Sequence, residues 1–85
     1  MLLIIGLSVA TGDFPVEALK NADLTLAAAG FKKEVSSVVK PGKEYSITYE
    51  GPDTPKQKIE DLLRALAERH HLTLSIETEE SVRFP

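Results

Sequence analysis

The chain has 85 residues, the size of one small domain, and its 42% hydrophobic and 27% charged residues are ordinary globular values. Its formal charge of -3 argues against a sequence-independent nucleic-acid binder, which needs a basic surface. The chain has no cysteine, which excludes disulfides, thiolate metal sites and a cysteine nucleophile and fits a reducing compartment.

The first residues predict a strand in the centre of a sheet. Residues 2–9 are apolar on both faces, as in a strand that is covered on both sides. Gly6 inside this run indicates a bulge or a close backbone approach. The run is short and no Lys or Arg precedes it, so we expect no signal peptide. A membrane span needs about 20 apolar residues, and we therefore expect a cytoplasmic protein without membrane contact.

A first helix is predicted to follow and to run to about Ala29. Asp13 can cap it, and its first turn accepts Pro15. Gly30 stands where a left-handed C-terminal residue belongs, and Phe31 can make the hydrophobic contact that accompanies it. The apolar side of this helix is expected to comprise Val16, Leu19, Ala22, Leu26 and Ala29.

Two strands joined by a tight turn come next. Residues 31–39 predict a strand with imperfect alternation, and residues 44–50 alternate without interruption. Between them, Pro41 and Gly42 suit the two central positions of a type II turn.

The second helix and the strand after it have the clearest pattern. Thr54 can cap the helix, Pro55 suits its first turn, and Gln57 can complete a capping box. Residues 72–77 then alternate with a period of two, as in a half-buried strand. Val82 and Phe84 can form a short extra strand. The predicted apolar stripe of the helix comprises Ile59, Leu62, Leu63, Leu66 and Ala67.

This order of elements predicts a single α+β domain over residues 1–85. Because crossover connections are right-handed, both helices lie on one side of a four-stranded antiparallel sheet. The result is a ferredoxin-like βαββαβ sandwich with a short C-terminal extension. Its central strands are the first one and the one that contains Tyr45.

The side of the sheet away from the helices, here called the open face, is the predicted working surface. We expect both tyrosines to point into the core, which leaves a polar face without aromatic rings for base stacking. The residues that we expect the helices to cover are Tyr45, Ile47, Tyr49, Leu72 and Leu74. In the opposite register both tyrosines are exposed, which favours RNA binding. The residues expected to contact a partner are Leu2, Ile4, Ser46, Thr48, Thr73, Ser75, Glu77, Val82 and Phe84.

Other groups of polar residues favour structural interpretations. His70 and His71 end a helix, where partial positive charge is favourable, and no third metal ligand stands at a suitable spacing. Residues 8–13 lead into a helix but lack the glycines and lysine of a phosphate loop. Glu77, Glu79 and Glu80 favour solvated charge over a metal site. Candidate phosphate contacts are Lys32, Lys33, Lys40 and Lys43, which we expect to form one patch near a hairpin.

Three short passages have the pattern of a known family: Tyr45, Ile47 and Thr48; Ile59-Glu60-Asp61-Leu62 with Arg64; and Ile76, Thr78, Arg83 and Phe84. They resemble the GhoS-type antitoxin endoribonucleases of type V toxin–antitoxin systems. The chain is similar, more distantly, to small CRISPR-associated nucleases of the same fold. That family places an aspartate at the end of its first strand, where this chain has Ser8, and no catalytic residue is transferred here. The resemblance implies cleavage or binding of RNA.

Three hypotheses follow from the sequence. The first is a non-enzymatic interaction or regulatory module that binds a macromolecular partner through the open face or the C-terminal tail. A small acidic phage-type inhibitor, such as an anti-CRISPR protein, belongs to this class. The second is an RNA-binding protein or endoribonuclease of the antitoxin type. The third is a homodimer that uses Leu2, Ile4, Val82 and Phe84. We predict no catalytic residue, metal or cofactor, because no nucleophile, base and oxyanion donors converge.

Overall fold

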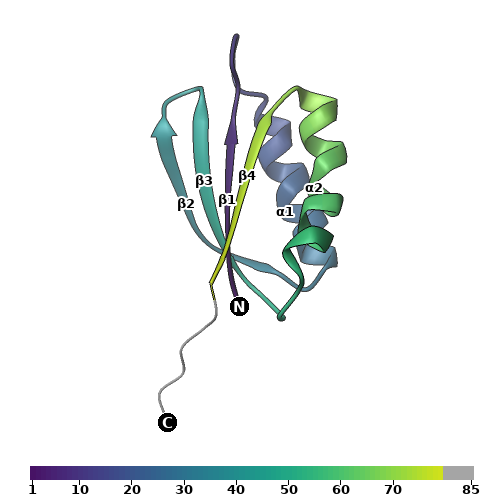
Figure 1. The fold of residues 1–85 in the computed structure, drawn as a ribbon. Coiled ribbons are helices and arrows are strands. Elements are labelled where there is room, and N and C mark those ends of the chain that lie inside the picture. The colour runs from purple at the N-terminus through teal and green to yellow at the C-terminus, as the bar shows by residue number, and fades with distance from the viewer. Residues whose placement is uncertain (80–85) are drawn as a thin grey trace.

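The computed structural model describes residues 1–79 and consists of one antiparallel sheet with two helices on the same face (Figure 1). Along the sheet the strand order is β2-β3-β1-β4, so β1 and β3 are central. These observations confirm the ferredoxin-like fold and the predicted central strands. The predicted strand at Val82 and Phe84 lies outside the described residues. The elements are β1 (Leu2–Ser8), α1 (Val16–Ala28), β2 (Lys32–Lys40), β3 (Glu44–Glu50), α2 (Lys56–His70) and β4 (Thr73–Glu79).

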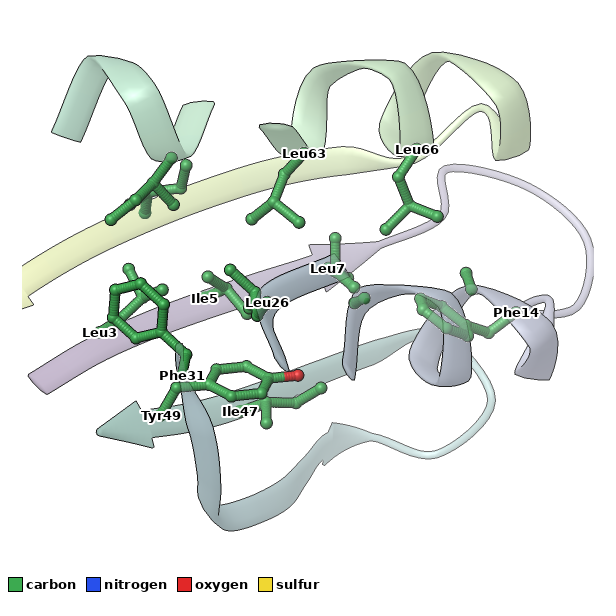
Figure 2. Packing of buried hydrophobic residues seen from close by; sticks show 14 residues of the cluster. Leu3, Ile5, Leu7, Phe14, Leu26, Phe31, Ile47, Tyr49, Leu63 and Leu66 are labelled. Carbon is green, nitrogen blue, oxygen red and sulfur yellow. The ribbon is translucent and has the colours of Figure 1, made fainter. Parts of the chain in front are cut away.

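A single hydrophobic core fills the space between the sheet and the helices (Figure 2). Alternate residues of β1 are buried, because side chains along a strand point to opposite faces. Leu63 and Leu66 extend from α2 toward the sheet. The largest side chains in the core that are less than 2% exposed are Leu3, Ile5, Leu7, Leu26, Ile47, Tyr49, Ile59 and Leu63.

The predicted N-terminal caps are wrong for both helices. Proline occupies the N-cap position itself, at Pro15 and at Pro55, and neither cap is made by a side chain. Thr54 therefore stands one residue too early to cap α2, and its hydroxyl donates to the carbonyl of Pro52 instead (2.9 Å). Gln57 donates to Asp61 one turn later (3.1 Å) rather than reaching back to the cap.

The C-terminus of α1 agrees with the sequence. Gly30 has a φ of 91°, and its N–H donates to the carbonyl of Ala27 (3.0 Å). Phe31 donates to Leu26 (2.9 Å), which completes a Schellman motif. The ring of Phe31 is 4% exposed and makes the expected hydrophobic contact.

The buried face of α1 differs from the predicted one at its start. Val16 is 76% exposed, because it precedes the buried Ala18 by two residues and so lies on the opposite side of the helix. Phe14, which the sequence pattern did not place in the core, is buried just before the helix. Its ring lies 4.7 Å from that of Tyr45.

The irregular alternation in β2 has a structural cause. Its register against β3 shifts between Lys33 and Val35 and again between Val38 and Lys40. Each shift leaves an extra residue, as in a β-bulge, and this breaks a strict period of two. All nine residues of β2 are exposed, so the helices do not cover this edge of the sheet.

Candidate interaction surface

The open face is built by the outward residues of all four strands. Residues that pair directly across antiparallel strands point to the same face, so the register defines rows across the sheet. No described element covers these rows in residues 1–79, because both helices lie on the other face. Three rows across β3, β1 and β4 are Thr48–Ile4–Glu77, Ser46–Gly6–Ser75 and Glu44–Ser8–Thr73.

Both tyrosines of β3 lie on the helix side of the sheet. Tyr49 is 1% exposed and Tyr45 packs against the core. The hydroxyl of Tyr49 donates a hydrogen bond to the Asp23 carboxylate on α1. Burial, followed by this contact with Asp23, raises the pKa of Tyr49 far above its ordinary value of about 10. The prediction that the helices cover these rings is therefore confirmed.

Apolar side chains lie in the middle of this polar face. Leu2 and Ile4 are partly buried on β1, and Val35 on β2 is 55% exposed. Val35 pairs with Thr48, which in turn pairs with Ile4, so the two apolar residues share one row. A surface of this composition can make apolar contacts and hydrogen bonds at the same time.

Gly6, in the middle of the open face, leaves space for the Ser75 side chain. A Cβ atom at Gly6 would lie 2.5 Å from the hydroxyl oxygen of Ser75. The register of β1 is unbroken on both sides, so the predicted bulge at Gly6 is not found. The close neighbour of Gly6 is the Ser75 side chain rather than another backbone.

Most of the predicted contact residues share the open face. The described ones are Leu2, Ile4, Ser46, Thr48, Thr73, Ser75 and Glu77. Val82 and Phe84 lie outside the described residues. For all nine predicted residues, contact with a partner stays a prediction.

The four candidate lysines do not form one patch. Lys32 and Lys33 begin β2, whereas Lys40 ends it and Lys43 follows in the turn, about 26 Å away along a strand of this length. Lys33 forms an ion pair with Asp23 (3.0 Å), and the ammonium group of Lys43 donates to the carbonyl of Gly12. The expected single patch is wrong because β2 separates the two pairs; a contact with phosphate stays a prediction.

The two histidines end α2, as the sequence indicates. His71 has a φ of 55°, in the left-handed region, and closes the helix there. Nε2 of His70 is buried without a hydrogen-bond partner among residues 1–79. Both histidines line a cavity of about 480 Å³ with residues of the β1–α1 loop, among them Thr11 and Asp13. Within the described part of the chain, no three His, Cys, Asp or Glu residues are placed to hold a metal ion.

A groove between α2 and β4 was missed by sequence reasoning. It has a volume of about 530 Å³. We call it the α2–β4 groove. Its apolar lining consists of Ala67, Leu72, Leu74 and Ile76. Its polar lining consists of Glu60, Arg64, Glu68 and His71. The alternation of β4 indicated which residues face the helices, but not that α2 leaves space beside this edge.

None of the helices in residues 1–79 is long and apolar enough to cross a membrane. α2, the longer of the two, has 15 residues and many charges.

Comparison with known proteins identifies the fold and no family. No family model matches the chain, and no curated protein matches it. Among solved structures, the chain is similar to part of a formyltetrahydrofolate deformylase from Burkholderia mallei, with a TM-score of 0.72 and 11% identity over 89% of this chain. It is also similar to part of a hydantoinase/carbamoylase family amidase from Burkholderia ambifaria, with a TM-score of 0.53 and 8% identity over 89% of this chain. The chain spans 27% and 26% of the lengths of these two proteins.

Proposed function

We propose that this protein is a non-enzymatic interaction or regulatory module that binds a macromolecular partner through the open face of its sheet. The observation that carries the proposal is the row formed by Val35, Thr48 and Ile4, which places apolar groups among hydroxyls on an uncovered face of the described residues. Exposed apolar groups of this kind, rimmed by polar residues, mark interaction sites. Glu50, Glu77 and Glu79 give the rim an acidic character.

The structural neighbours support a modular role. In the deformylase and in the amidase, the matching portion is about a quarter of a longer chain. A fold that occurs as part of larger proteins can add binding or regulation to them. An acidic inhibitor of a nucleic-acid machine, with carboxylates in the place of phosphates, is one form that such a module can take in this chain.

The test places a large cation in the centre of the open face. Thr48→Arg adds charge and bulk beside Ile4, whereas the matched control Leu24→Arg makes a comparable change on α1, where Leu24 is 60% exposed. We expect wild-type protein and L24R, immobilised and exposed to an extract of the source cells, to retain the same partner, and T48R to lose it.

Two results would contradict this function. One is that T48R and L24R retain the captured partner equally. The other is catalytic turnover by the purified protein, measured against cellular RNA and extract metabolites, which would remove the non-enzymatic role.

RNA binding of the antitoxin type is the second candidate, and the exposure of all nine residues of β2 is the observation that favours it. Lys32 and Lys40 lie at opposite ends of this strand and point to the open face with their partners Glu50 and Glu44. Contacts to phosphate weaken as salt rises. We expect an RNA-binding chain to show retention of cellular RNA that falls with salt and that falls further in K32Q/K40Q. Absence of both effects, together with intact RNA, would exclude this candidate.

A further inference from the structure

The two edges of the sheet differ in their protection against pairing with another strand. β2 carries lysines at both ends and two register irregularities, features that block edge-to-edge pairing. β4 pairs with β1 in unbroken register over its whole length and contains no Lys or Pro. At this edge of the described sheet, the outer N–H and C=O groups of β4 therefore form a regular row that no other strand uses.

The α2–β4 groove lies beside this edge on the helix side. Leu74 and Ile76 line it and point to the helix side of β4, as Thr78 does. A strand added to β4 would send alternate side chains the same way, because neighbouring strands share one alternation. Every second residue of the added strand would therefore point toward the α2–β4 groove, where Leu74 and Ile76 supply apolar contacts.

The other side chains of an added strand would meet carboxylates. Glu77 and Glu79 point to the open face, because they pair with Ile4 and Leu2. Neither forms an ion pair within residues 1–79. Opposite charges in direct cross-strand pairs are stabilising, so Lys or Arg suits these positions.

The polar lining of the groove carries both signs. Glu60 and Glu68 contribute two carboxylates from α2. Arg64, a cation of this lining, lies 3.5 Å from Asp61. The complementarity to a basic strand therefore comes from Glu77 and Glu79 on β4.

We propose that the β4 edge and the α2–β4 groove bind an extended peptide segment of another protein, in which apolar residues alternate with Lys or Arg. The segment adds a fifth strand to the sheet: main-chain hydrogen bonds to β4 hold it, and its alternate apolar side chains fill the groove. This site uses the edge of the sheet and its helix side, and it shares Glu77 and Glu79 with the rim of the open face. It does not use Thr48 or Val35, on which the open-face proposal rests.

The probe is the synthetic peptide acetyl-Lys-Val-Lys-Val-Lys-Val-Lys-amide, titrated into isotope-labelled full-length protein and followed by amide NMR. We expect saturable shifts along β4 and along the groove-facing side of α2, with β2 unaffected. Slower hydrogen exchange of the outer β4 amides should accompany them. A peptide of the same pattern with Glu in place of Lys should not bind, and one with the same composition in block order should bind much more weakly.

Paired variants test the charge contribution. E77K/E79K should weaken peptide binding at least about tenfold, because like charges then oppose each other across the new strand pair. The control E17K/E34K changes the net charge by the same amount on α1 and β2. It should leave the affinity within about twofold, since exposed charges beyond a Debye length are largely screened.

Backbone substitution tests the strand pairing itself. Two peptides carry N-methyl groups on alternate residues. One is methylated on the odd-numbered residues and the other on the even-numbered ones. The peptide whose methyl groups point toward β4 should lose binding at least about tenfold, because its donors to β4 are removed, and the other should keep it. Equal binding of both, or shifts confined to β2 or the open face, would overturn the proposal.

Sedimentation of the protein alone tests whether another copy of this chain, and not a peptide of another protein, occupies the β4 edge. A dimer that E77K/E79K converts to a monomer would assign the β4 edge to another copy of this chain and overturn the peptide proposal. T48R lies on β3 and should bind the peptide normally. Failure of the peptide site and failure of the open-face function therefore give different results.

Discussion

A polar contact lies beside the core at Tyr49. Its ring is buried among apolar side chains, and its hydroxyl meets Asp23, which also forms an ion pair with Lys33 (3.0 Å). The contact joins β3, α1 and β2 at the side of the sheet that the helices cover least. A buried hydroxyl without a partner would be costly, so Asp23 is what permits a tyrosine here.

Tyr49→Phe tests this contact through its pH dependence. Burial and the Asp23 contact raise the pKa of Tyr49 above its unfolded value of about 10. Its contribution to stability is therefore complete below pH 10 and is lost as the pH rises further, because the unfolded state then releases the phenol proton first. We expect Y49F to lose about 0.5–1.5 kcal/mol at pH 7.

Above pH 10, the free energy of unfolding of the wild type should fall faster than that of Y49F, by up to about 1.4 kcal/mol per pH unit. Urea unfolding at pH 7, 10 and 11 measures the difference between the two proteins, which share every other titrating group. A difference that stays constant through pH 11 would show that the phenol titrates normally in the native state.

At the scale of elements, α2 has the most regular apolar stripe, but the residues of the stripe differ in how deeply they are buried. Ile59 and Leu63 are fully buried, whereas Leu62 is 36% exposed at the margin of the stripe. Helical periodicity gives the direction of a side chain but not how far the neighbouring elements cover it. Leu62 instead lines a shallow cavity between the two helices, together with Leu24.

Leu63→Ala and Leu62→Ala form a matched pair on adjacent residues. L63A should cost about 2–5 kcal/mol, because it leaves a cavity in the core. L62A should cost well under half of the L63A value, because part of the side chain is already in water. Denaturant midpoints measured under one set of conditions compare the two, and equal losses would contradict the observed difference in burial.

β2 also contains a residue that points toward the helices without being buried. Its direct pairing with β3 puts Val38 opposite Tyr45 on the helix side, yet Val38 is 58% exposed. Direction toward the helices therefore does not ensure burial at an edge strand that the helices leave exposed.

Residues 1–79 form one core, and both helices together with β1, β3 and β4 contribute to it. Leu26 of α1 and Leu63 of α2 belong to the same buried cluster as Ile5 and Ile47 of the central strands (Figure 2). Small domains with one core usually unfold in a single cooperative step.

We therefore expect two-state unfolding, with a free energy of about 4–13 kcal/mol for a chain of this length. Far-UV circular dichroism reports the helices, and tyrosine fluorescence reports Tyr45 and Tyr49 on β3. The two signals should give the same urea midpoint. Separate midpoints would mean that the helices and the sheet unfold as different units.

Local patterns in the sequence determined the elements, their order and which side of the sheet the helices cover. Alternation in β3 placed Tyr45 and Tyr49 toward the helices, and Gly30 marked the end of α1, because strand periodicity and left-handed backbone are properties of neighbouring residues. The proline caps, the exposure of Val16 and the separation of the lysines along β2 are local features that these patterns misplaced. Tertiary structure alone decided the contact of Phe14 with Tyr45 and the α2–β4 groove. Both depend on distances between elements far apart in the chain, and a pattern of near neighbours does not contain them.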